Sequence, residues 1–286
     1  MKRYLYWVVG LLLLAGCSHS RTAEVPTLTV TIEPLRYFTE AIAGPRYRVV
    51  SMVPEGSSPE TYEPTAQQMV ALSKSMLFVK VGDLGFERTW TEKIQGLSPS
   101  LVVVDSSKGI AAVESSSRGV TDQHTWMSCD NALVIAKNIY ESLSQADASN
   151  KTYYEQRYKA LTENIVELDA KLDSMLQNIQ VKTFIIYHPA LTYFAKEYGL
   201  QQLAVEEDGR EPSAATLASV IDKAKAEDVK MMLVQKEFDR RNAEIVVNAL
   251  GGIDMVTIDP LSPRWNEEML NIGRTIATQG NKPAMQ

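Results

Sequence analysis

Four side chains that can bind a metal ion stand at the boundaries of predicted strands and helices. His188 comes directly after an apolar run, Asp259 follows another, and Glu60 lies in a proline-framed turn after a third. His124 separates a long loop from a helix-like segment. In an open α/β sheet, ligands bind beyond the carboxyl ends of the strands, so we expect these side chains to meet in one crevice between two lobes. Two imidazoles and two carboxylates suit Zn²⁺, Mn²⁺ or Fe²⁺, and the pattern therefore predicts a metal site.

Each of the four residues also has a simpler explanation when it is taken alone. A histidine at the end of a strand is commonly a hydrogen-bonded structural residue, and an aspartate before a proline, such as Asp259, usually forms a turn. Glu60 by itself could be a solvated loop acid. The agreement of all four positions is what favours a metal site. The third histidine of the chain, His19, falls in a polar N-terminal segment, where we expect no role for it.

Catalytic alternatives find less support in the sequence. The chain has no HExxH, no GxSxG and no phosphate-binding loop. Cys129 could form a thiol pair with His124 or His188, or act as a further ligand, although a buried apolar role is the simpler explanation. Glu60 and Asp259 could form a hydrolytic carboxylate pair, but no aromatic cluster is obviously placed to stack sugars. Since four protein ligands leave no coordination position for water, we expect a binding protein and no enzyme.

Alternating strand and helix patterns would position these residues. The first half of the chain predicts strands at 28–32, 47–53, 76–81 and 101–104, with helices at 34–43, 65–74, around Trp90 and at 128–143. The second half predicts strands at 183–187, 200–205, 230–234 and 254–258, with helices at 190–198, 213–226, 240–250 and 264–279. Such alternation indicates parallel sheets with helices on their faces.

The segment between these two regions has a different pattern. Residues 148–180 contain no Gly or Pro, and apolar residues recur every three or four positions, which predicts one amphipathic helix of roughly 45–50 Å. This helix could be a solvated coiled-coil arm or a rigid spine, and the return of strand and helix alternation favours the spine. The predicted fold is therefore α/β with two lobes, 27–147 and 181–286, each a parallel-type β-sheet flanked by helices, joined by one long rigid α-helix.

The N-terminus predicts export from the cytoplasm. Residues 1–16 hold a short positive region and an apolar run that is too short to span a bilayer, as in a signal peptide. Leu14-Ala15-Gly16-Cys17 looks like a bacterial lipobox, which implies cleavage before Cys17, lipidation of its thiol, and a tether at 17–26. A generic signal peptide with an incidental cysteine is the alternative. If Cys17 carries lipid, Cys129 has no disulfide partner, because the chain has only two cysteines.

Length and charge limit the classes of partner. A chain of 286 residues can form two lobes of ordinary size with a large core. Its net charge is -6 and no stretch is a run of Lys or Arg. Phosphate backbones require a positive surface, so we expect no nucleic-acid partner.

Six sequence runs stand in order over most of the chain. They are VPEGSSPETYEP (53–64), VGDLGFE (81–87), DQHTWMS (122–128), YHPALTYFAKEYGL (187–200), DGREPS (208–213) and IDPL (258–261). Together they resemble the zinc- and manganese-uptake family of solute-binding proteins, the metal-binding lipoproteins of bacterial ABC importers. The resemblance implies a central helix as the inter-lobe spine, capture of Zn²⁺ or Mn²⁺ between the lobes, and delivery to an ABC permease in the inner or cytoplasmic membrane. We also expect a monomer, lipid-anchored at a periplasmic or extracellular membrane face.

The resemblance assigns three of the four candidate ligands directly. It carries the family's second ligand to His124, the third to His188 and the fourth, a carboxylate, to Asp259. The family usually has a histidine where this chain has Glu60, and the extra carboxylate moves preference toward harder ions such as Mn²⁺. Residues 105–123 also lack the histidines that many zinc members have in this loop. Because the His188 position follows the zinc branch, we expect Zn²⁺ ahead of Mn²⁺. An adhesin or binding module with lost or altered metal affinity, and a metallohydrolase, are the alternative functions.

Overall fold

The computed structural model describes residues 25–115, 119–206, 211–238 and 240–281. The predicted signal peptide, Cys17, His19 and most of the predicted tether lie outside these residues. Within the described residues, none of the helices is both long and apolar enough to cross a membrane.

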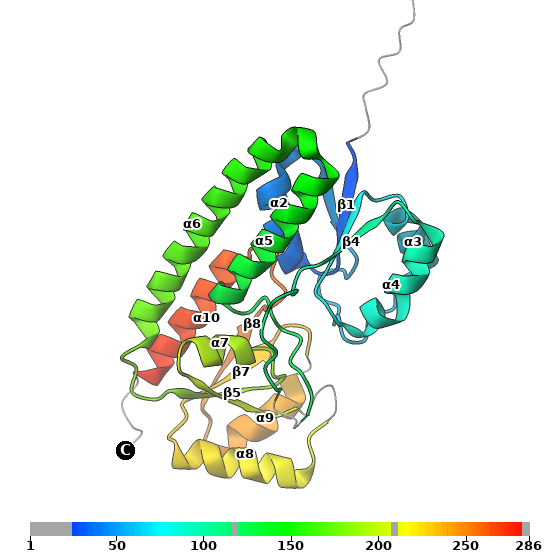
Figure 1. The fold of residues 1–286 in the computed structure, drawn as a ribbon. Coiled ribbons are helices and arrows are strands. Elements are labelled where there is room, and N and C mark those ends of the chain that lie inside the picture. Colours follow the sequence, from blue (N-terminus) through cyan, green and yellow to red (C-terminus); the bar gives the residue numbers. More distant parts are fainter. Residues whose placement is uncertain (1–24, 116–118, 207–210, 239, 282–286) are drawn as a thin grey trace, which may run out of the picture.

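The first half of the chain forms a four-stranded sheet in which every pair of neighbouring strands is parallel. The strand order is β2-β1-β3-β4, and helices connect successive strands, as Figure 1 shows. The elements are β1 (Thr27–Val30), α2 (Glu33–Ala43), β2 (Arg48–Ser51), α3 (Ala66–Leu72), β3 (Leu77–Lys80), α4 (Gly85–Leu97), β4 (Val102–Asp105) and α5 (Cys129–Ala146).

The second half repeats this connection pattern in a sheet of order β6-β5-β7-β8. Its elements are β5 (Thr183–Ile186), α7 (Thr192–Glu197), β6 (Gln201–Ala204), α8 (Ala214–Ala226), β7 (Met231–Gln235), α9 (Arg240–Ala249), β8 (Asp254–Ile258) and α10 (Trp265–Gly280). In the register of the sheet, Ile186 of β5 pairs with Ala204 of β6, and Leu233 of β7 pairs with Ile186 on the other side. The parallel strands therefore deliver the residues that follow them to the same edge. The predicted α/β fold class is confirmed.

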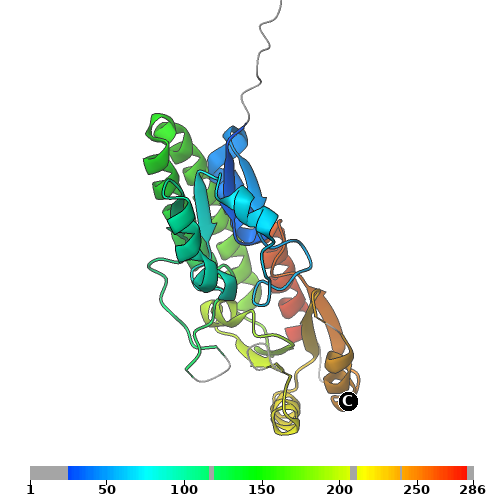
Figure 2. The ribbon, with the colours of Figure 1, turned by 90° about the vertical axis from the view of Figure 1, so that its right-hand side faces the viewer.

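The long helix α6 (Lys151–Leu176) joins the two halves. It packs against α2 and α5 of the first half and against α10 of the second, and Figure 1 shows it running beside α5 and α10 from one half to the other. Figure 2 shows the two halves at opposite ends of the molecule in a view turned by 90°. Its buried residues are Tyr154, Leu161, Ile165, Leu168, Leu172 and Leu176. The spine interpretation is confirmed and the solvated coiled-coil arm is wrong. With 26 residues, α6 is about 39 Å long and shorter than predicted, because residues 148–150 form a 3₁₀ turn whose side chains bond to Asp147.

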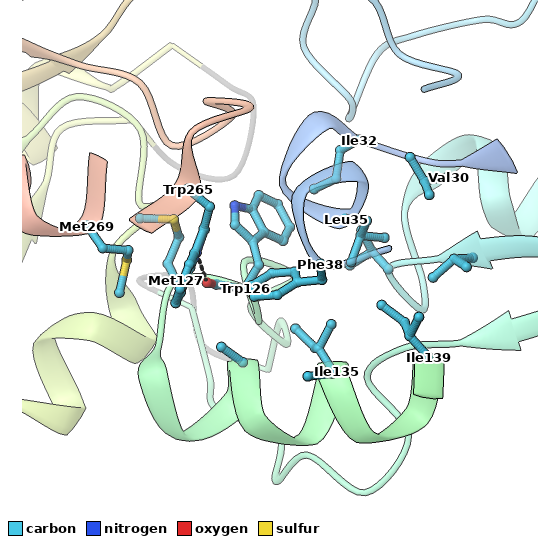
Figure 3. Close-up of a cluster of buried hydrophobic side chains, with 14 of the residues drawn as sticks. Val30, Ile32, Leu35, Phe38, Trp126, Met127, Ile135, Ile139, Trp265 and Met269 are labelled. Carbon is cyan, nitrogen blue, oxygen red and sulfur yellow. Dashed lines mark hydrogen bonds between the residues drawn. The ribbon is translucent and has the colours of Figure 1, made fainter. Parts of the chain in front are cut away.

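A buried aromatic cluster connects the two halves beside the spine. Trp126, which precedes α5, donates through Nε1 to the carbonyl of Pro260 at 2.8 Å. Trp265, at the start of α10, donates through Nε1 to the carbonyl of Trp126, also at 2.8 Å. Figure 3 shows both indoles against Phe38 of α2, whose ring centroid lies 4.8 Å from that of Trp265. This shared core limits relative motion of the two sheets to small displacements.

Candidate metal centre

Glu60, His124 and His188 come together between the two sheets. Nε2 of His188 lies 3.2 Å from Nε2 of His124 and 3.2 Å from Oε1 of Glu60. Both imidazoles are buried, whereas 32% of the Glu60 side chain is exposed. Two ligands of a tetrahedral Zn²⁺, each about 2.05 Å from the ion, are about 3.3 Å apart. The observed separations therefore suit donors that share one ion.

The loop that carries Glu60 rests on the start of α4. A Cβ added at Gly85 would lie 3.1 Å from the backbone oxygen of Glu60, so a larger residue would require the two segments to move apart by a few tenths of an ångström. The buried carboxylate of Glu87 organises the turn before α4. It accepts backbone hydrogen bonds from Val81, Gly82 and Leu84. The VGDLGFE run thus has a physical role, because it forms the support for the Glu60 loop.

Hydrogen bonds hold His188 at its backbone and at one ring nitrogen, and an aromatic ring packs on the face of its imidazole. Nδ1 lies 2.6 Å from Oε2 of Glu206, which follows β6. Gln235, at the end of β7, donates to the His188 carbonyl at 2.6 Å and accepts from its backbone N–H at 3.3 Å. The Phe238 ring stacks on the imidazole with the centroids 5.2 Å apart. A carboxylate on Nδ1 sets the tautomer that presents Nε2 to a metal ion.

His124 has an equivalent carboxylate behind its ring. Oδ1 of Asp122 accepts from the His124 backbone N–H at 2.7 Å and lies 2.9 Å from its Nδ1. The Trp126 ring lies against the imidazole, with the centroids 5.2 Å apart. Ser128 then caps α5 by accepting from the Asn131 backbone N–H. The DQHTWMS run therefore combines an orienting acid, a candidate ligand, an inter-lobe anchor and a helix cap.

The carboxylates around His188 favour a positive charge between them. Burial lowers the pKa of His188, but the hydrogen bonds to Glu206 and Glu60 and their charges outweigh burial and raise it to about 10. Burial raises the pKa of Glu60, and the hydrogen bond and charge of His188 outweigh it, so the pKa of this carboxyl is lowered. With Nδ1 directed at Glu206, the second proton of the imidazolium lies on Nε2, between Glu60 and His124. A divalent cation at this point would replace that proton.

Asp259 is not part of this group of three. Its Oδ2 lies 2.5 Å from Nζ of Lys236, and its backbone N–H donates to Oε1 of Glu268 at 2.9 Å. Its Oδ1 is buried and has no hydrogen-bond partner in the described part of the chain. The structure therefore brings together three of the four predicted residues and pairs the fourth with a lysine.

The space between the three residues is too small for an organic ligand. They line a cavity of about 10 Å³, together with Trp126 and Phe238. Sites for organic ligands enclose about 300 Å³ or more. A wider hollow of about 240 Å³ also touches the three residues and leads past exposed side chains to solvent. A hollow of about 620 Å³ lies between β2 and α3, but none of its described lining residues is an acid or a histidine.

Sequence reasoning missed three acids at this site. Asp122 and Glu206 orient the two imidazoles, and Glu237 lines the small cavity. Glu206 and Glu237 each follow a strand of the second sheet, so the strand-end rule that selected His188 could have identified them. The rule by itself could not assign them roles, because strand ends carry many solvated acids.

Cys129 is a free, buried cysteine at the start of α5. Sγ lies near carboxylate oxygens of Asp169 and Glu197, but both Glu197 oxygens accept backbone N–H groups of α5, from Cys129 and Asp130. Burial raises the thiol pKa well above its usual range. Glu197 is therefore a helix cap, and Cys129 has the structural role that the sequence favours over a nucleophile.

The comparisons with known proteins agree over both sheets and the spine. The family described as zinc-uptake complex component A periplasmic, ZnuA, matches residues 28–275. The high-affinity zinc uptake system protein ZnuA of Bacillus subtilis (strain 168) is 29% identical, over 91% of this chain and 89% of that protein. The iron ABC transporter substrate-binding lipoprotein MtsA of Streptococcus pyogenes serotype M1 is 27% identical, over 83% of this chain and 82% of that protein. A crystal structure of ZnuA has a TM-score of 0.85 and 33% identity, and covers 90% of this chain and 100% of that chain.

Proposed function

The chain belongs to the zinc-uptake complex component A periplasmic family, the metal-binding solute-binding proteins of ABC importers, and from this premise we propose that it captures a divalent transition metal between its two lobes and delivers it to a membrane permease. The members of this family are binding proteins and not enzymes, as the sequence predicts for this chain. The metal ion is the transported cargo.

The observation that carries the proposal is the convergence of Glu60 and two imidazole Nε2 atoms on one point, with a carboxylate behind each ring. Three such donors are unfavourable neighbours unless a proton or a metal cation lies between them, and a divalent cation would replace the proton on Nε2 of His188. Glu60, His124 and His188 bind the ion. Asp259 is the fourth ligand, and its buried Oδ1, which lacks a hydrogen-bond partner among the described residues, supports this assignment.

Zn²⁺ is the preferred cargo and Mn²⁺ the second. The relatives support a transition metal without fixing one, since one is named for zinc and another for iron. Two histidine nitrogens suit Zn²⁺. Glu60 in place of an imidazole adds an oxygen donor and lets Mn²⁺ compete.

The protein acts as a monomer at the outer face of a membrane. The lipobox-like sequence before Cys17, which lies outside the described residues, supports a lipid anchor there, and one relative is named a lipoprotein. The shared core of Trp126 and Trp265 supports small rocking of the lobes in preference to wide hinge closure. Release then requires the permease to disturb a site that is otherwise rigid.

Calorimetric titration of the metal-stripped, full-length protein with ZnCl₂ and MnCl₂ tests the proposal. We expect one site with a Kd below about 1 μM for at least one of the two ions, and loss of that site in His124→Ala and His188→Ala. Wild-type protein that binds neither ion more tightly than micromolar would refute metal capture. A hydrolase would instead turn over an ester or phosphoester in a reaction abolished by chelation.

A further inference from the structure

Glu237 lines the same small cavity as Glu60, His124 and His188. Its Oε2 is buried and has no hydrogen-bond partner anywhere in the described part of the chain. A carboxylate oxygen that has lost water and gained no donor is costly, typically by about 1–3 kcal/mol, unless a cation or a proton compensates it. The cavity beside it is where the two imidazoles and Glu60 converge.

The fold places Glu237 at this point through residues that also fix His188. Glu237 comes two residues after the end of β7, between Lys236 and Phe238. Gln235, the last residue of β7, bonds the His188 backbone, and Phe238 stacks on the His188 ring. The Glu237 backbone is therefore held on both sides by residues in contact with a candidate ligand. Its carboxylate is within electrostatic range of Asp259, His188 and Lys236.

Lys236 and Glu237 are adjacent in the sequence but differ in their ion pairs. Lys236 neutralises Asp259 through Oδ2. No described ion pair of this kind involves Glu237, so no described cationic side chain neutralises its carboxylate, which can bind a cation in addition to Glu60.

We infer that Glu237 is a further ligand of the captured ion and the residue that lets this site accept Mn²⁺ as well as Zn²⁺. The inference rests on the proposed capture of a metal by Glu60, His124 and His188. Zn²⁺ is satisfied by four donors, whereas Mn²⁺ prefers more, with oxygen among them. Glu237 supplies the additional oxygen without displacing an imidazole.

The decisive measurement compares Mn²⁺ and Zn²⁺ affinities of wild type and Glu237→Gln. Chelator competition with MnCl₂ or ZnCl₂ on metal-stripped, full-length protein should show Mn²⁺ affinity falling about 10- to 100-fold in the variant. Zn²⁺ affinity should fall by less than about fivefold, because four donors remain. Co²⁺ bound to Glu237→Gln should show stronger visible absorption than Co²⁺ bound to wild type, since fewer ligands bring it closer to tetrahedral geometry.

Two further variants separate coordination from charge. Glu237→Asp keeps the charge but withdraws the oxygen by one methylene, so it should also lose Mn²⁺ affinity. Glu55→Gln removes an exposed carboxylate near Lys236 that does not line the cavity, and it should bind both ions as wild type does. Equal losses for the two ions, wild-type Mn²⁺ affinity in Glu237→Asp, or a Glu55→Gln effect as large as that of Glu237→Gln would each overturn the ligand role. Wild type that binds neither ion would instead refute the proposed function itself.

Discussion

Metal binding should release a proton from His188, and Glu206 should control that release. The carboxylates of Glu206 and Glu60 outweigh burial and raise the His188 pKa from 6.5 to about 10. This shift corresponds to roughly 5 kcal/mol in favour of the imidazolium. The proton that must leave lies on Nε2, because Nδ1 is held by Glu206 at 2.6 Å.

The sign of the pH dependence follows from this competition. Below about pH 10, His188 carries the proton that the ion must displace, so the affinity for the ion should rise with pH by about tenfold per unit. Between pH 6.5 and 8.5 the Kd for Zn²⁺ should fall about 100-fold, with about one proton released per ion. Titration calorimetry in buffers of different ionisation enthalpy counts the released protons directly.

Glu206→Gln tests the cause of this behaviour. The variant removes one of the two carboxylates that stabilise the imidazolium, so the His188 pKa should fall and fewer protons should be released at pH 8.5. Zn²⁺ affinity should also fall by about 10- to 100-fold, because the amide no longer anchors Nδ1 as a carboxylate does. Glu211→Gln, an exposed acid in the sequence after Glu206, is the matched control and should behave as wild type. A wild-type affinity that does not change between pH 6.5 and 8.5 would refute the reasoning.

Three further predictions concern the ligands and the inter-lobe core. Glu60→His should raise the ratio of Zn²⁺ to Mn²⁺ affinity by about tenfold or more, because the variant adds a nitrogen donor. Competition titrations measure this ratio, and an unchanged ratio would place Glu60 outside the coordination shell. Asp259→Asn should weaken Zn²⁺ binding about 10- to 100-fold in the same assay, and wild-type affinity would place Asp259 outside the coordination shell. Trp126→Phe leaves the Pro260 carbonyl without its hydrogen-bond donor, so the free energy of unfolding in urea titrations should fall by about 1–3 kcal/mol. The control is Trp90→Phe, at a partly exposed position, which should change the free energy of unfolding by less than about 0.5 kcal/mol.

The sequence by itself determined the elements and most of the candidate ligands. Strand and helix alternation identified both sheets, because apolar periodicity and the turn residues between elements are local properties. The apolar stripe of residues 148–180, which contain no Gly or Pro, identified the spine, although hydrogen bonds to Asp147 delay the start of its helix. Glu60 and His188 were found by their positions after predicted strands and His124 by its position between a loop and a helix, and the structure brings all three within reach of one ion.

Only the tertiary structure decided which donors meet and which are neutralised. His124 and His188 are 64 residues apart in the chain, and their 3.2 Å contact depends on how the two sheets pack around Trp126 and Trp265. Lys236 and Asp259 are paired because β7 and β8 are neighbours in the sheet, a pairing that no local pattern contains. Local periodicity fixes the elements, whereas the partner of a charged side chain depends on strand order and lobe packing, and these determine how the site is completed.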